Sequence, residues 1–262
     1  MASNALLEIE NIERSFGGMR ALGGVSARID RDGAWGVVGP NGSGKTTLFN
    51  IVTGFLRPDA GTVRFGGSDV TGWYPDRIAR RGLVRTFQNT LNPTRLTVME
   101  NLLVAPGNQL GESVLRGLFR PGAVSRQEGA NIERAREVAA LVKLDHHLDS
   151  RAGDLSGGQR KLLMLGQALM RSPTLVMLDE PVAGVHPNLI NDIVDTIHRL
   201  RAQGQNFLII EHNMSVVRRL CDFIYVLDAG QVLASGPTEE TLQRDVVLDA
   251  YLGRTVTGEV ER

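Results

Sequence analysis

The stretch from Gly39 to Thr47 constrains the fold of this chain more than any other. It fits the phosphate-binding pattern G-x-x-x-x-G-K-[ST] at every required position, between an apolar strand that ends at Val38 and a helix expected to begin near Lys45. Its glycines let backbone N–H groups turn inward around an anion, and the positive end of the helix points at the same oxygens. The sequence therefore predicts a site for a nucleoside triphosphate. The expected binding residues are Gly39, Asn41, Gly42, Ser43, Gly44, Lys45, Thr46 and Thr47.

Within this loop, two side chains carry the chemistry. Lys45 can place a point charge on the β- and γ-phosphates, and the hydroxyl of Thr46 can ligate Mg²⁺. A second feature supports this interpretation, because the apolar run Leu175–Leu178 predicts a central parallel strand covered on both faces, and it ends in Asp179-Glu180. Carboxylates at the carboxyl end of such a strand lie beside the ligand crevice. We expect Asp179 to hold Mg²⁺ and Glu180 to orient and deprotonate an attacking water.

A second anion site is predicted at Ser156-Gly157-Gly158-Gln159. Two glycines at the start of a helix expose backbone N–H groups, and Ser156 adds a hydroxyl. A chain with two separate phosphate sites raises the possibility that two chains share each nucleotide.

The pattern of strands and helices predicts an α/β protein in two interleaved parts. Alternating strands fill the N-terminal part, and we expect a hairpin turn at Asp32-Gly33 into the strand that feeds the phosphate loop. Helical periodicity dominates from about Phe87 to Asp154, including a long helix expected from Asn131 to Val142, and strands alternate with helices afterwards. We expect Thr238 to cap a C-terminal helix. The expected domains are a discontinuous α/β core at 1–87 and 160–237, an inserted helical region at 88–159, and a C-terminal helix and tail at 238–262.

Composition narrows the class of protein. The net charge of the 262 residues is zero, so no bulk positive field draws the chain to nucleic acid. The lone Cys221 cannot form an internal disulfide, which fits a reducing compartment. No apolar run approaches the ~18 residues that span a bilayer. Any association with a membrane is therefore expected to come through partners.

Taken together, these motifs resemble the ATP-binding subunit of ABC transporters, over nearly the whole chain and in the expected order. The resemblance rests on Gly39–Thr47, Gln88, Leu155–Gln159, Leu175–Glu180 and His212. It implies a P-loop NTPase (RecA-like) core with a parallel central sheet, an N-terminal antiparallel β part and an inserted α-helical subdomain. It also implies ATP and Mg²⁺ as ligands.

The resemblance assigns roles to single residues. Phe16 matches the aromatic that stacks on adenine, and Gln88 matches the glutamine that touches Mg²⁺ and the membrane subunits. The segment Ser156–Gln159 matches the signature that closes over the partner chain's ATP, and His212 matches the switch histidine at the γ-phosphate. The implied catalytic residues are Glu180, His212 and Lys45, and the implied metal ligands are Thr46, Gln88 and Asp179.

A narrower resemblance is carried by four segments, which look like those of the ATPases of branched-chain amino acid importers: Val84–Asn89, the extended segment Pro106–Gln127, Ile210–Met214 and Ala250–Gly253. It implies integral membrane permease subunits, a second ATP-binding subunit of the same or a related chain, a solute-binding protein, and a peripheral position at the cytoplasmic face of the cell membrane. Two alternatives stay open. One is a soluble ABC-type ATPase in translation or DNA maintenance, and the other is the ATPase of a lipid or lipopolysaccharide exporter.

One position departs from the family pattern. His186 stands where many relatives carry an aspartate, in a loop that reaches across the dimer in that family. We interpret it as a helix cap before Pro187.

Overall fold

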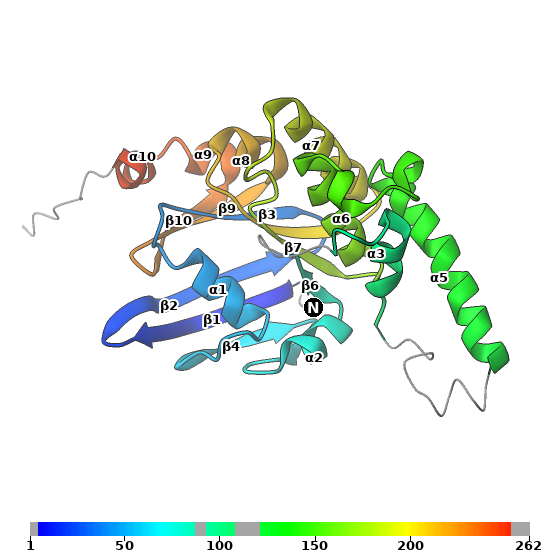
Figure 1. Ribbon diagram of the computed structural model, residues 1–262. Helices are drawn as coiled ribbons and strands as arrows, with labels where there is room; N and C mark the ends of the chain where they lie inside the picture. Colours follow the sequence, from blue (N-terminus) through cyan, green and yellow to red (C-terminus); the bar gives the residue numbers. More distant parts are fainter. Residues whose placement is uncertain (1–4, 87–92, 108–120, 253–262) are drawn as a thin grey trace, which may run out of the picture.

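The computed structural model describes residues 5–86, 93–107 and 121–252, and it contains two sheets flanked by helices (Figure 1). The first sheet is antiparallel, with the strand order β2-β1-β4-β5. Its strands are β1 (Ala5–Phe16), β2 (Met19–Asp30), β4 (Ala60–Phe65) and β5 (Ser68–Asp69). This sheet is the N-terminal antiparallel part that the sequence predicts.

The second sheet is the central one, with the order β10-β9-β3-β8-β7-β6. Its neighbouring strands are parallel except for the edge strand β10, which pairs antiparallel with β9. The strands are β3 (Ala34–Val38), β6 (Leu83–Arg85), β7 (Leu175–Asp179), β8 (Asn206–Ile210), β9 (Phe223–Asp228) and β10 (Gln231–Pro237). Because β3, β7 and β8 are parallel neighbours, their carboxyl ends meet at one edge of the sheet.

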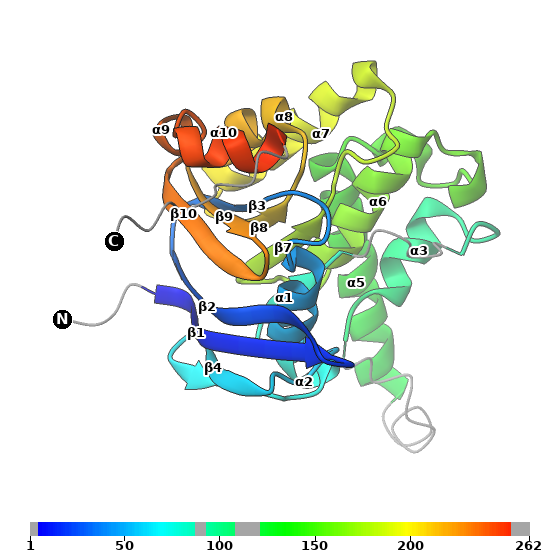
Figure 2. The ribbon, with the colours of Figure 1, turned by 90° about the vertical axis from the view of Figure 1, so that its left-hand side faces the viewer.

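Helices cover the central sheet and form the region between β6 and β7. The helices are α1 (Lys45–Val52), α2 (Pro75–Arg80), α3 (Val98–Val104), α5 (Pro121–Leu141), α6 (Gly157–Leu169), α7 (Pro187–Ala202), α8 (Met214–Leu220), α9 (Thr238–Thr241) and α10 (Asp245–Leu252), with 3₁₀ turns at Asp145–His147 and Ala152–Asp154. Figure 2 shows α7 to α10 on one side of the central sheet and the antiparallel sheet on the other, with α1 between the two sheets. Helices α3, α5 and α6 contact one another. None of the described helices is both long and apolar enough to cross a bilayer.

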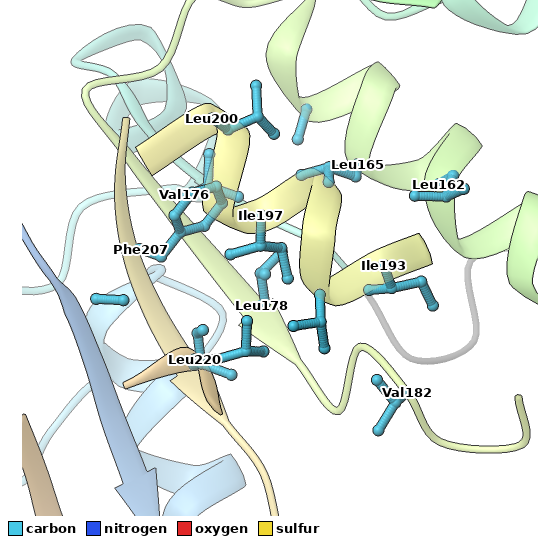
Figure 3. Packing of buried hydrophobic residues seen from close by; sticks show 14 of the residues in the cluster. Leu162, Leu165, Val176, Leu178, Val182, Ile193, Ile197, Leu200, Phe207 and Leu220 are labelled. Carbon is cyan, nitrogen blue, oxygen red and sulfur yellow. The ribbon is translucent and has the colours of Figure 1, made fainter. Parts of the chain in front are cut away.

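The strand β7 explains why the core has two layers. Its residues alternate between two hydrophobic clusters, with Val176 and Leu178 in one and Leu175 and Met177 in the other. Figure 3 shows the first cluster, in which residues of β7 and β8 lie against Ile193, Ile197 and Leu200 of α7 and Leu162 and Leu165 of α6. The second cluster joins the other face of the sheet to α1 and the antiparallel sheet. An apolar strand with no alternation is therefore buried on both faces, as predicted.

Three expectations about local structure are wrong or need revision. The chain makes no hairpin at Asp32-Gly33, because β2 and β3 belong to different sheets and β3 pairs with β8 and β9 instead. Thr238 does not cap α9, since its hydroxyl donates to the carbonyl oxygen of Cys221 at 2.7 Å and Pro237 holds the cap position. Helix α5 begins ten residues before the predicted start at Asn131. The domain boundaries stay a prediction.

Candidate functional site

The phosphate loop connects β3 to α1 with a backbone that requires glycine. Gly39, Gly42 and Gly44 have φ angles of 148°, 82° and 102°, which side chains other than glycine rarely adopt. A Cβ atom on Gly39 would lie 2.0 Å from the carbonyl oxygen of Leu227, and one on Gly44 would lie 2.7 Å from that of Ala21. The loop is therefore pressed against neighbouring backbone, which fixes its shape before any ligand binds.

Lys45 is buried inside this loop. Its Nζ donates to the carbonyl oxygens of Gly39 and Pro40, both at 2.8 Å, and lies 3.4 Å from Oγ of Ser43. Burial lowers the pKa of Lys45, while the nearby carboxylates of Glu180 and Asp179 act in the opposite direction. The ammonium group is thus held at the loop by neutral acceptors, in a position from which it can turn to an anion.

Glu180 faces the same space as the phosphate loop. A cavity of about 180 Å³ is lined by Glu180 together with loop and neighbouring residues. The other lining residues are Ala21, Asn41, Gly42, Gly44, Lys45, Thr46 and Thr47. The structure therefore brings together the predicted base and most of the predicted phosphate-binding residues.

His212 joins this group from the next strand. Asp179 at the end of β7 is in register with Ile210 at the end of β8, and the backbone N–H of Glu180 donates to the Ile210 carbonyl oxygen at 3.0 Å. Nδ1 of His212 lies 3.4 Å from Oε1 of Glu180. Glu180 has a φ of 48°, a left-handed conformation that is strained for a side chain of this kind. Strain of this kind often marks functional sites, and here it coincides with the predicted base.

Asp179 has a partner that the sequence analysis did not foresee. Nη2 of Arg85 lies 2.6 Å from Oδ2 of Asp179, and the two side chains are only 5% and 7% exposed. Nη1 of Arg85 donates to Oδ1 of Asn50 on α1 at 2.7 Å. The described residues contain no cluster of three or more His, Cys, Asp or Glu side chains that could hold a metal.

The signature residues form the start of α6. Ser156 is the N-cap, and its Oγ accepts from the backbone N–H of Gln159 at 3.2 Å, while Oε1 of Gln159 accepts from the N–H of Ser156 at 2.8 Å. Gly158 packs closely on α7, since a Cβ atom there would lie 2.8 Å from Cβ of Leu189. No described signature residue lines the cavity around Lys45. This arrangement fits the idea that the signature serves a second nucleotide.

The remaining predicted residues lie apart from this cavity or outside the described part of the chain. Phe16 ends β1 and is 48% exposed, with Cζ of Arg14 at 5.0 Å from the centre of its ring. Gln88 lies outside the described residues. His186 is the N-cap of α7, and its Nδ1 accepts from the N–H of Asn188 at 3.4 Å, which confirms its interpretation as a cap.

Sequence reasoning assigned no role at the site to three charged residues near Glu180: Arg85, Lys161 and Glu211. Glu211 is fully buried, and burial raises the pKa of its carboxyl group while hydrogen bonds from three backbone N–H groups oppose the rise. Nζ of Lys161 donates to the carbonyl oxygen of Glu180 at 3.2 Å. A charged residue directly after the apolar strand Phe207–Ile210 was a visible signal for Glu211. Arg85 and Lys161 reach the site from distant segments and carried no local signal.

Comparison with known proteins places these features in a family. The family model described as ABC transporter matches residues 22–183. A Methanocaldococcus jannaschii protein, named as a probable branched-chain amino acid transport ATP-binding protein LivG, is 41% identical over 252 residues, which are 95% of this chain and 97% of that protein. A Pseudomonas aeruginosa protein, named as high-affinity branched-chain amino acid transport ATP-binding protein BraF, is 38% identical over 96% of this chain and 99% of that protein.

Solved structures agree with the sequence relatives. A nucleotide-free ATP-binding cassette from an ABC transporter superposes with a TM-score of 0.82 at 40% identity, covering 94% of this chain and 98% of that one. An ATP-binding cassette in its ADP conformation superposes with a TM-score of 0.83 at 39% identity, covering 96% of this chain and 100% of that one. The fold class and the family resemblance predicted from the motifs are confirmed.

Proposed function

The chain belongs to the ABC transporter family, and we propose that it powers the uptake of branched-chain amino acids or similarly small polar solutes. It is an ATP-binding transport ATPase, as its family and relatives imply. The observation that carries the proposal is the meeting of Lys45 and Glu180 at one cavity, with His212 beside Glu180. The names of the relatives support import over the alternatives of a soluble ATPase or an exporter.

In this proposal, the chain's own residues position the ATP and the attacking water and stabilise the charge that develops on the phosphate oxygens. They form no covalent bond to the substrate. Lys45 moves its ammonium from the loop carbonyls to the β- and γ-phosphates of ATP. Glu180 orients the attacking water and takes its proton, while His212 contacts the γ-phosphate. Thr46, Asp179 and Gln88 would hold Mg²⁺, and a threonine hydroxyl, a carboxylate and an amide oxygen are donors that fit this ion. When bound, Mg²⁺ neutralises charge on the phosphate oxygens.

The second part of the proposal concerns a dimer. Two such subunits, identical or related, would enclose each ATP between the phosphate loop of one chain and the signature of the other. Closure of the dimer then depends on the γ-phosphate, and hydrolysis of ATP allows the dimer to open again. The exposed position of Ser156 at the tip of α6 supports this role, because the residue is available to another molecule.

The third part concerns the membrane partner. A groove of about 400 Å³ lies between α2, β6, α3 and α6, and its lining includes Thr86, two positions before Gln88. Phe55 and Val104 also line it and are 53% and 66% exposed. Apolar side chains gathered at a groove mark interaction sites. We infer that a cytoplasmic helix of an integral membrane permease docks here, so that the chain is held at the cytoplasmic face of the membrane. A solute-binding protein would join through that complex.

The substitution Glu180→Gln tests the assignment of the base. We expect the purified, assembled complex to keep its affinity for ATP but to lose about 100-fold or more of its turnover, because an amide cannot take the proton. Exposed Glu133 on α5, paired with Arg136, provides the control Glu133→Gln, which should leave turnover unchanged. Substantial residual hydrolysis in the Glu180→Gln complex would contradict the role of Glu180.

The solute and the partners need a separate experiment. We expect permease subunits to co-purify with the chain, and ATP to drive accumulation of labelled leucine in vesicles that contain the assembled complex with its solute-binding protein. Co-purification with nucleic acid, or nucleic-acid stimulation of ATP hydrolysis, would favour the soluble alternative. ATP-driven movement of a lipid in place of leucine would favour the exporter.

A further inference from the structure

Lys161 is one of few lysines in this chain, and it lies near the carboxylates at the end of β7. Only three of the 29 basic residues are lysines, and two of these, Lys45 and Lys161, face the carboxylates at the end of β7. Lys161 lies in the first turns of α6 and is half-buried. Burial lowers its pKa, and the negative charges of Glu180, Glu211 and Asp179 oppose this. Its ammonium group therefore sits among the acidic residues of the catalytic edge without lining the cavity around Lys45.

The contact of Lys161 is made with backbone. Its Nζ donates to the carbonyl oxygen of Glu180 at 3.2 Å. This residue is the one with the left-handed φ of 48°. A strained residue holds its conformation only where surrounding contacts fix it. The bond from Lys161 fixes the peptide that follows the catalytic carboxylate.

Glu211 holds the same segment from the opposite side. Its Oε1 accepts from the backbone N–H of Val182 at 3.3 Å, and its Oε2 accepts from the N–H groups of His212 and Asn213 at 3.1 and 3.2 Å. The side chain is fully buried, so these bonds are made away from water. One carboxylate thus ties the loop after β7 to the loop after β8, which carries His212.

These contacts anchor the three residues from Glu180 to Val182 at both ends. The N–H of Glu180 is bound to Ile210, its carbonyl oxygen to Lys161, and the N–H of Val182 to Glu211. Lys161 and Glu211 both reach this segment with polar side-chain atoms that bond to its backbone. Their placement fits the task of holding the backbone that aims Glu180.

Lys161 also belongs to the helix that begins with the signature. It follows Gln159 by two residues, within one turn of α6. The signature is the part of this chain that would meet the partner's nucleotide, whereas Glu180 acts on the nucleotide of its own phosphate loop. One hydrogen bond from Lys161 thus connects the helix that begins with the signature to the peptide that follows Glu180.

We propose that Lys161 and Glu211 are positioning residues for Glu180, and that Lys161 transmits occupancy of the signature by the partner's nucleotide to the orientation of Glu180. The second half of this inference rests on the proposed function, in which two chains share each ATP. It predicts that hydrolysis at one site depends on the nucleotide at the other through a bond inside a single chain.

Kinetics of the assembled complex test the positioning role. We expect Lys161→Met and Glu211→Gln to lower kcat about tenfold or more while KM for ATP stays within twofold, because a misaimed base slows the chemical step without removing phosphate contacts. Lys161→Arg restores a donor and should recover most of the turnover. The matched control is Lys143→Met, since Lys143 is an exposed lysine paired with Asp192 at 2.7 Å. If Lys161→Met and Glu211→Gln lower only the melting temperature, the positioning role is wrong. It is also wrong if KM for ATP rises by the same factor by which kcat falls.

A second measurement tests the link between sites. In a Glu180→Gln background, we expect ATP-dependent association of chains, followed by light scattering, to be the same with Lys161 or with Lys161→Met. In the active complex, the Hill coefficient for ATP hydrolysis should exceed 1 and fall to about 1 in Lys161→Met. If Glu180→Gln chains with Lys161 intact fail to associate with ATP, the proposed dimer is wrong. If they associate but the Lys161→Met complex keeps the Hill coefficient of the Lys143→Met complex, the dimer stands and the link is wrong.

Discussion

The two glycine-bearing anion sites of this chain, the phosphate loop and the signature, are built in different ways. The phosphate loop is strained and enclosed, with left-handed glycines pressed on the backbone of Leu227 and Ala21. The signature is an ordinary helix start, in which a capping box between Ser156 and Gln159 satisfies the local donors. A Cβ atom on Gly157 would come no closer than 3.6 Å to its surroundings.

This difference indicates what each site requires. The phosphate loop is shaped within one chain, so its affinity for phosphate is prepared before the ligand arrives. The signature has no comparable enclosure within the described residues, and its N-cap residue Ser156 is exposed. In the proposed dimer, a single chain would therefore hold one preformed half-site, the phosphate loop, and one open half-site, the signature.

The largest effect should come from Gly39→Ala. A Cβ atom at 2.0 Å from the Leu227 carbonyl oxygen, on a residue with a φ of 148°, forces the backbone to move. We expect the free energy of unfolding, measured by urea denaturation, to fall by about 3 kcal/mol or more. The control is Gly157→Ala, where ordinary contacts and better helix propensity should keep the change within about 1 kcal/mol. Equal losses in both variants would contradict the contrast between the two sites.

The phosphate loop was predictable because its signal is local. The spacing of its glycines, Lys45 and the flanking strand lies within a few residues, and so does the cap formed by His186 before Pro187. The pairing of β3 was not predictable in this way. The turn signal at Asp32-Gly33 is real, but β3 takes its partners from β8 and β9, more than 160 residues away.

The charged residues around Glu180 could not be predicted from the sequence either, because they too come from distant segments. Arg85 and Asp179 are 94 residues apart in sequence, and Lys161 and Glu180 are 19 apart on different elements. No periodicity connects such pairs, since they meet only when β6, β7 and α6 are packed together. The sequence predicted Lys45, Glu180 and His212 as the reacting residues, whereas the contacts that hold Glu180 became visible only in the fold.

A smaller effect is expected from Ser156→Ala, which opens the cap of α6. Loss of the capping box should lower the free energy of unfolding by about 1 kcal/mol. Thr97→Ala is the matched control, because Thr97 and Glu100 form the same kind of box at the start of α3. Both variants should lose similar stability in urea denaturation, and both should bind ATP as single chains.

Only Ser156→Ala, the variant in the signature, should also weaken the ATP-dependent association of two chains that carry Glu180→Gln. If Thr97→Ala weakens association as much as Ser156→Ala does, the effect is one of helix stability, and the open half-site is not the signature.

The smallest effect concerns Phe16, which would lie against the base of the nucleotide rather than its phosphates. Arg14 stands 5.0 Å from the centre of the ring and is itself paired with Asp59 at 2.6 Å, so the ring is held in place before ligand binds. Phe16→Ala should raise the Kd for ATP about fivefold, or about 1 kcal/mol, the scale of one aromatic contact, by calorimetric titration of the single chain. Phe55→Ala removes another exposed phenylalanine, in the groove between α2, β6, α3 and α6, and should leave that Kd unchanged. An unchanged Kd in Phe16→Ala would mean that the preformed half-site ends at the phosphates and that adenine is recognised elsewhere.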